Sequence, residues 1–167
     1  MKILIVTHYF LPHAGGIEIV AYNQAKELVK QGHEVTIVSS KIGDEPEEEV
    51  MDEIKIRRIP AWNWFEDHWG VPYPVYSFKL LKIMKEEVNK TDIVHVHDLS
   101  YLSSFIGALA ARLNKRPLIL MQHVKKIETK NKIVNIIQSI IFSTSGRYIV
   151  KASNKIVVCN EETSKWM

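Results

Sequence analysis

The chain has 167 residues, of which 46% are hydrophobic and 25% are charged, and it contains a single cysteine, Cys159. This is ordinary globular composition, with enough length for one domain with a hydrophobic core. One cysteine excludes an intrachain disulfide, and we expect a cytoplasmic protein without a segment that spans a bilayer.

Charge is unevenly distributed along the chain, although the net charge is only +3. Residues 44–53 hold seven acidic residues and no Lys or Arg, whereas residues 111–167 hold eleven Lys or Arg and three acids. A basic half suits phosphate-bearing ligands or an anionic membrane, and it equally fits a solvated surface. We do not expect nucleic acid as a partner, because no recognition helix or RNA-binding signature is present.

Short apolar runs alternate with helical patterns from the first residues onward. The runs predict strands at residues 2–6, 34–39, 54–59, 92–96, 118–122 and 155–158. Apolar spacing predicts helices at residues 16–30, 76–89, 101–113 and 131–151, and another helix begins near Asn160. Gly32 is expected to end the first helix, because glycine readily adopts the left-handed cap conformation. This alternation predicts an α/β fold, a Rossmann-like three-layer sandwich with a mainly parallel sheet.

Two segments between these elements are expected to be irregular. Residues 41–53 are acidic and contain a glycine and a proline, which indicates an exposed loop. Residues 61–74 are rich in aromatic side chains, with three Trp and one Phe among residues 62–69. Such aromatic segments stack on sugars, enter a membrane interface or pack as a small local cluster, and the sequence leaves these alternatives open.

Three of the predicted helices have apolar faces of the kind that pack against a core. In the helix at 76–89 the face consists of Phe78, Leu81, Met84 and Val88. In the helix at 101–113 it consists of Leu102, Phe105, Ile106, Leu109 and Leu113. In the helix at 131–151 it consists of Ile133, Ile136, Ile137, Ile140 and Ile141.

The segment between the first strand and the first helix contains two adjacent glycines, Gly15 and Gly16. Glycines let a backbone approach an anion, and a helix N-terminus offers free N–H groups and a partial positive charge. A phosphate or diphosphate is therefore a natural ligand, although a Gly pair also serves simply to make a tight turn. No G-x-G-x-x-G pattern follows the strand and no Walker-type lysine follows the glycines, which disfavours dinucleotide cofactors and ATP hydrolysis.

Polar side chains also follow the fourth, fifth and sixth predicted strands, where ligands of open parallel sheets gather. His95 and His97 share one face of the fourth strand, but no third or fourth ligand is suitably spaced, so we expect no metal. His97 and Asp98 either reach into a ligand cleft or brace the next loop. His123 ends the fifth strand and is a candidate for contact with sugar hydroxyls or phosphate. Cys159 follows the sixth strand; no Cys–His arrangement is evident, and we expect the thiol to be inert.

These segments together resemble a known family. Pro12-x-x-Gly15-Gly16-x-Glu18 and residues 28–35 resemble the start of the retaining nucleotide-sugar glycosyltransferases of the GT-B fold, family 4 type. Residues 92–97 resemble the strand in the middle of that family's N-terminal domain. His123 stands where the family has a histidine after the next strand, and residues 156–163 resemble the entry to the last helix of that domain. The matches follow the family's order over nearly the whole chain.

The resemblance implies that residues 1–167 form one half of a GT-B fold, the acceptor-side domain, and that a C-terminal donor-binding domain is absent. It implies sugar transfer with retention from a UDP- or GDP-sugar to a sugar or lipid-linked acceptor, with no metal and no cofactor besides this co-substrate. The amides of Gly15 and Gly16 would stabilise the diphosphate, His123 would be the catalytic contact to donor sugar or phosphate, and His97 with Asp98 would face the acceptor. The chain alone would be inactive or nearly so.

Two other functions remain open from the sequence. The chain could be an acceptor- or membrane-binding subunit that pairs with a separate donor-binding chain, with peripheral contact at the inner face of the membrane. It could also be a self-contained Rossmann-like isomerase of sugar phosphates or nucleotide sugars, which would need a nucleotide site within these residues. The donor sugar, the nucleotide, the acceptor and the oligomeric state are not determined by the sequence.

Overall fold

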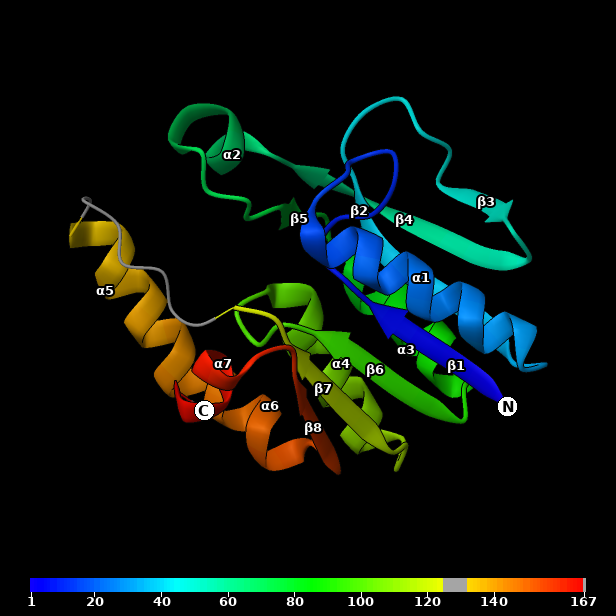
Figure 1. Cartoon of the computed structure of the whole chain (residues 1–167). Coiled ribbons are helices and arrows are strands. Elements are labelled where there is room, and N and C mark those ends of the chain that lie inside the picture. Colours follow the sequence, from blue (N-terminus) through cyan, green and yellow to red (C-terminus); the bar gives the residue numbers. More distant parts are fainter. Residues whose placement is uncertain (125–131, 167) are drawn as a thin grey trace.

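The structure, a computed structural model, describes residues 1–124 and 132–166. In these residues a sheet of eight strands lies between layers of helices (Figure 1). The strands are β1 (Lys2–Val6), β2 (Glu34–Lys41), β3 (Glu48–Met51), β4 (Ile54–Trp62), β5 (Val75–Tyr76), β6 (Ile93–His97), β7 (Leu118–Gln122) and β8 (Lys155–Val158). The helices are α1 (Gly16–Lys30), α2 (Trp64–Trp69), α3 (Lys79–Asn89), α4 (Leu102–Leu113), α5 (Lys132–Ile141), α6 (Arg147–Ala152) and α7 (Glu161–Trp166), with a π-helical turn at Phe142–Gly146 between α5 and α6.

The strand order is β3-β4-β2-β1-β6-β7-β8, and β5 pairs with β4. All neighbours pair in parallel except β3 and β5, which run antiparallel to β4. The predicted α/β fold with a mainly parallel, Rossmann-like sheet is confirmed. All six predicted strands are present. Continuous apolar runs suit the central strands, which are covered on both faces, whereas β8 lies at the edge of the sheet and is mostly exposed.

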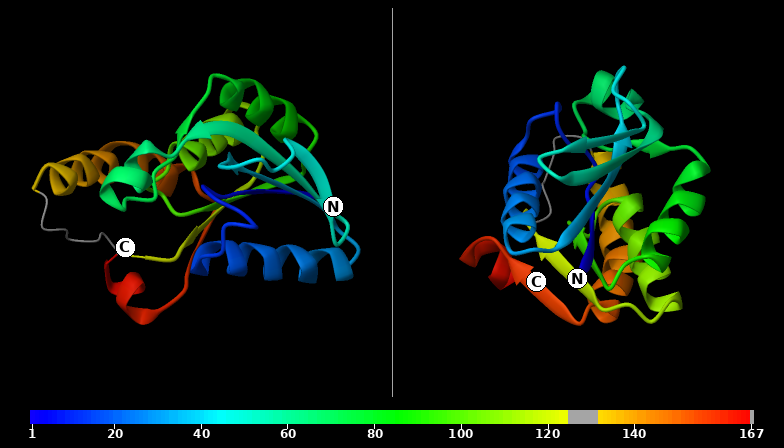
Figure 2. Two further views of the ribbon diagram at one scale, coloured as in Figure 1. Left: turned by 90° about the horizontal axis from the view of Figure 1, so that it is seen from above. Right: turned by 90° about the vertical axis from the view of Figure 1, so that its right-hand side faces the viewer.

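Both faces of the central strands are buried, which makes the fold a three-layer sandwich. The side chains of successive residues in β1 point to opposite faces of the sheet. Ile3 and Ile5 pack with Ala21 and Ala25 of α1, whereas Leu4 packs in the other cluster, with side chains of α3, α4 and α6. Figure 2 shows the sheet in the right-hand view between α1 on one side and these three helices on the other.

The two segments expected to be irregular contain regular structure. Within residues 41–53, β3 pairs with β4, because Arg58 of β4 is buried and its guanidinium binds Glu49 of β3 at 2.8 Å. Charged residues on such an edge strand also discourage pairing with another chain. Within residues 61–74, α2 forms one short helix that ends at Gly70, whose φ of 62° is in the left-handed region.

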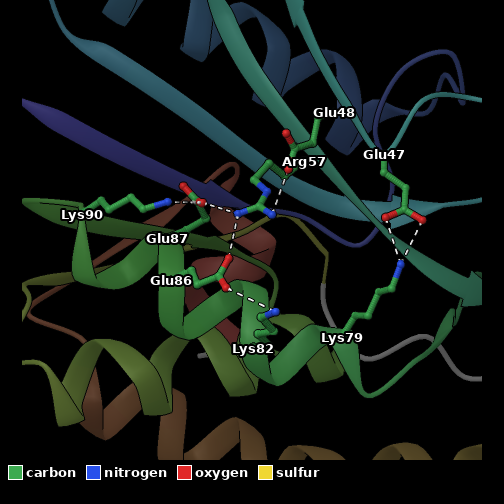
Figure 3. A network of polar contacts seen from close by, with 8 residues as sticks. All are labelled: Glu47, Glu48, Arg57, Lys79, Lys82, Glu86, Glu87 and Lys90. Carbon is green, nitrogen blue, oxygen red and sulfur yellow. Dashed lines mark hydrogen bonds and ion pairs between the residues drawn. The ribbon is translucent and has the colours of Figure 1, made fainter.

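A network of ion pairs fastens β3 and β4 to α3, and Figure 3 shows its members. The Arg57 guanidinium lies 2.9 Å from Glu48, 3.2 Å from Glu86 and 2.6 Å from Glu87. Lys90 adds a contact of 3.3 Å to Glu87. Most of these side chains are partly exposed, so each pair contributes only about 0–1 kcal/mol. The network gives two of the seven acidic residues at 44–53, Glu47 and Glu48, a structural role at the sheet edge.

The apolar faces expected for α3 and α4 are confirmed only in part: Met84 and Val88 of α3 are fully buried, and Phe105 and Ile106 of α4 pack against the core. Phe78 is 94% exposed and Leu81 is 54% exposed, while Leu80 and Ile83 are buried instead. α3 begins at Lys79, three residues later than predicted, because β5 occupies the start of that segment. The face of α4 that contacts the sheet consists of small residues: Ser103, Ser104, Gly107, Ala108 and Ala111. A Cβ added at Gly107 would lie 3.4 Å from side chains of β1 and β6, so the small face allows close packing.

A continuous helical segment, Lys132–Ala152, contains α5, the π-helical turn and α6. It confirms the helix predicted at 131–151, apart from residue 131, which lies outside the described residues. By length and composition this helix could cross a membrane, and only 17% of its most apolar window is buried. The expectation that no segment meets this criterion is therefore wrong. α6 nevertheless packs against the domain, since its Ile149 is fully buried in the hydrophobic core.

Candidate functional site

The candidate residues lie at the carboxyl ends of β1, β6, β7 and β8, which are neighbours in the parallel sheet. Parallel strands end at the same edge, so the loops that follow them meet there. The histidines from different loops interact accordingly. His8, which follows β1, interacts electrostatically with His13 in the same loop and with His123 beyond β7. The sequence-predicted features at the first, fourth, fifth and sixth strands are thus parts of one site.

The two glycines of the first loop have different surroundings. α1 begins at Gly16 and Gly15 is its N-cap residue. A Cβ added at Gly15 would lie 2.4 Å from Glu18 Oε2, so this position must be glycine for the carboxylate to pack where it does. A Cβ added at Gly16 would meet nothing within 4 Å. The space beside Gly16 is therefore open, and the first N–H groups of α1 have no partner within the helix.

Glu18, to which the sequence assigned no role, is the polar centre of this loop. Its side chain is only 3% exposed. Its Oε1 accepts a hydrogen bond from His13 Nδ1 at 3.1 Å and lies 4.0 Å from His8 Nε2. The His8 ring stacks on Tyr101 with 3.8 Å between centroids. The sequence signalled Glu18 through the motif Pro12-x-x-Gly15-Gly16-x-Glu18 and through its closeness along the chain to His8 and His13. It gave no signal for the contact between His8 and Tyr101, which lie 93 positions apart.

A chain of three side chains crosses the loops after β6, β7 and β8. His97 Nδ1 lies 2.9 Å from His123 Nε2, and Cys159 Sγ lies 3.3 Å from His123 Nδ1. Burial raises the pKa of the Cys159 thiol, so the sulfur stays protonated. If the S–H group donates a hydrogen bond to His123 Nδ1, the other nitrogen of His123 carries a proton. His123 Nε2–H then donates to His97. The expectation that no Cys–His arrangement exists is wrong, although the raised thiol pKa agrees with an unreactive cysteine.

Asp98 supports His123 through the backbone. Its Oδ1 accepts a hydrogen bond from the His123 backbone N–H at 2.9 Å, and its φ is 58°. Burial raises the pKa of the Asp98 carboxyl to about 6, against the opposing effect of the N–H groups of His123 and Val124. His97 and Asp98 are both 0% exposed, and His123 is only partly buried. Of His97, Asp98 and His123, only His123 is therefore accessible to a ligand in this structure.

Burial also keeps the neighbouring imidazoles neutral. It lowers the pKa of His8 to about 3 and of His95 to about 4, and it lowers the pKa of His97 well below its usual value. His95 and His97 lie with ring centroids 4.7 Å apart, which confirms that they share a face of β6. In residues 1–124 and 132–166, no group of three or more His, Cys, Asp or Glu side chains is arranged to hold a metal ion.

Comparison with known proteins relates this chain to glycosyltransferases. It is 30% identical over 130 residues to an uncharacterized glycosyltransferase of Methanocaldococcus jannaschii, a match that covers 76% of this chain and 32% of that protein. It is 27% identical over 133 residues to an uncharacterized 42.6 kDa protein in the cps region of Klebsiella pneumoniae, a match that covers 70% of this chain and 35% of that one. The chain thus spans about a third of the length of these curated relatives.

Two solved structures share the fold. MurG of Acinetobacter baumannii matches 94% of this chain and 40% of its own, with a TM-score of 0.52 and 18% identity. HepE of Anabaena, solved in complex with UDP-glucose, matches 95% of this chain and 43% of its own, with a TM-score of 0.51 and 14% identity. The Rossmann-like sheet of this chain corresponds to one half of these GT-B structures.

Residues 14–167 match Glycosyltransferase Family 4. With this match over most of its length, the chain belongs to Glycosyltransferase Family 4.

Proposed function

We propose that this chain is the N-terminal, acceptor-side domain of a retaining glycosyltransferase that uses a nucleotide-sugar donor. The observation that carries the proposal is the shared edge of the sheet, where the open N-terminus of α1 at Gly16 and the partly exposed His123 belong to one site. A helix N-terminus favours a diphosphate, and a neutral imidazole can contact a sugar hydroxyl or a phosphate oxygen. Family membership supports this choice over an isomerase, and the HepE complex supports a UDP-sugar as the donor class.

In this proposal Gly15, Gly16 and His123 keep the roles that the sequence suggested, whereas His97 and Asp98, both 0% exposed, support His123 and do not contact the acceptor. The amides at Gly15 and Gly16 stabilise the departing diphosphate, where negative charge develops during transfer. His123 contacts the donor sugar or the phosphate, while the contact of its ring with His97 and the hydrogen bond from its backbone N–H to Asp98 hold it in position. No step is assigned to a metal. A second, donor-binding domain completes the site, since the matched segments make up only 32% and 35% of the two relatives.

A titration of the chain with UDP, GDP and their sugar conjugates, followed by NMR, tests this division of labour. We expect binding no tighter than roughly millimolar, about −4 kcal/mol, because half a site lacks the contacts to the nucleotide. Shifts should be confined to the Gly15–Gly16 loop, His97 and His123. Micromolar binding of a nucleotide by this chain alone would contradict the proposal and would favour a self-contained enzyme.

We also propose a cytoplasmic location with peripheral membrane contact. On α5, Ile136 is 60% exposed and Ile140 is 56% exposed, and residues 111–167 are rich in Lys and Arg. Such a helix can lie in the interface of an anionic membrane. In co-sedimentation with vesicles that contain anionic lipid, we expect the chain to bind and Ile136→Glu to weaken binding. Equal recovery in the supernatant with and without anionic vesicles would argue against membrane contact.

A further inference from the structure

An apolar groove lies between α5 and the segment that contains α2, which are neighbours at one end of the molecule (Figure 2, left-hand view). Its volume is about 210 Å³. One wall consists of Phe65, Val71 and Tyr73, and the other of Val134, Ile137 and Ile141. Of the side chains that line it, only Tyr73 and Gln138 carry polar atoms. A bare sugar, which needs several polar partners, does not match such a lining.

The groove continues toward the candidate site. A second pocket of about 110 Å³ shares Tyr73 and Gln138 with it and is also lined by Ser100 and Tyr101. Tyr73 stacks on Tyr101 with 6.0 Å between centroids, and Tyr101 stacks on His8 at 3.8 Å. An elongated ligand can therefore occupy the groove with one end and reach the loops after β1 and β6 with the other.

Gln138 lies where the two pockets meet. Its side-chain oxygen is buried and has no hydrogen-bond partner in the part of the chain that the structure describes. A buried acceptor without a partner costs about 1–3 kcal/mol, and a donor on a bound ligand would remove this cost. The junction thus suits a polar group, whereas the groove beyond it suits hydrocarbon.

From this arrangement we propose that the groove binds the hydrocarbon chain of a lipid-linked acceptor, with the polar head group at Ser100 and Tyr101. This inference rests on the proposed function, because it names the acceptor class of the same site. A protein helix is about 10 Å across and does not fit a groove of this volume. A membrane surface would contact the outer residues of α5, such as Ile136, and would not need the concave wall formed with residues 65–73.

Binding of n-alkyl phosphates of four to twelve carbons to the chain, below their micelle concentrations, tests the proposal. Each methylene that enters the groove should tighten binding about fourfold. The gain should stop when the groove is full, so affinity is expected to reach a plateau within the series. Isoleucine methyl NMR signals of Ile137 and Ile141 should shift, whereas inorganic phosphate, the probe without a chain, should leave them unchanged.

Two variants of neighbouring residues provide a matched comparison. Ile137 lines the groove and is 46% exposed, whereas Ile136 lies outside it and is 60% exposed, so neither substitution should unfold the helix. Ile137→Gln should weaken binding of decyl phosphate at least tenfold, and Ile136→Gln should change it less than twofold. Affinity independent of chain length, or equal losses in both variants, would overturn the groove proposal. The nucleotide titration reports on the glycine loop, so either proposal can fail without the other.

Discussion

Gly16→Asp is expected to reduce glycosyl transfer by the two-domain enzyme about 100-fold or more. The substitution places a carboxylate in the open space before the N-terminus of α1, where the proposed diphosphate binds. Removal of one group that stabilises developing charge costs about 10²–10³ in rate, and a like charge at the same place should cost at least as much. Steady-state rates with saturating donor measure this effect directly.

Gly16→Ala is the matched control for this experiment. Nothing lies within 4 Å of the added Cβ, and alanine favours the helix over glycine by about 1 kcal/mol. An aspartate in the first turn is also compatible with the helix dipole, so neither variant should be unstable. Comparable turnover of the Ala and Asp variants would remove the Gly15–Gly16 loop from the mechanism. Gly15→Ala is a poor control, because its Cβ would displace Glu18.

Acid is expected to destabilise the chain steeply below pH 6.5. The pKa values of His8, His95 and His97 are lowered in the folded state, so the unfolded chain takes up three protons there that the folded chain does not. Their stabilising contribution is complete above the unfolded pKa of about 6.5 and is lost as the pH falls. Asp98 acts in the opposite direction: its pKa is raised to about 6 in the folded state, so the folded chain binds one proton there that the unfolded chain does not. Near pH 5 the unfolded chain therefore binds more protons than the folded chain, by about two, which gives a slope on the order of 3 kcal/mol per pH unit.

Urea unfolding at pH 7, 6 and 5 measures this slope. His95→Gln should lower it by about 1.4 kcal/mol per pH unit, because one of the three proton-binding groups is removed. His68→Asn is the control, because it removes a histidine that is exposed on α2 and lies outside the buried group. A free energy of unfolding that stays constant between pH 7 and 5 would show that the histidines are not buried as neutral groups.

The sequence determined the order of the elements and the edge at which the site lies. Continuous apolar runs such as residues 2–6 and 118–122 indicate strands covered on both faces, and the alternation with helices makes them parallel. Parallel strands end together, so the sequence assigns candidates from separate loops, such as Gly16, His97 and His123, to one site. These inferences succeed because they depend on local pattern and on chain direction alone.

Only the tertiary structure decided which helix faces are buried and which side chains meet. α3 carries two overlapping apolar sets, and contact with the rest of the fold selects Leu80 and Ile83 over Phe78 and Leu81. α4 turns small residues to the sheet because close approach to β1 and β6 leaves no room for its larger ones. The contacts between His123 and Cys159 and between His8 and Tyr101 join distant positions, and no local pattern encodes such pairs.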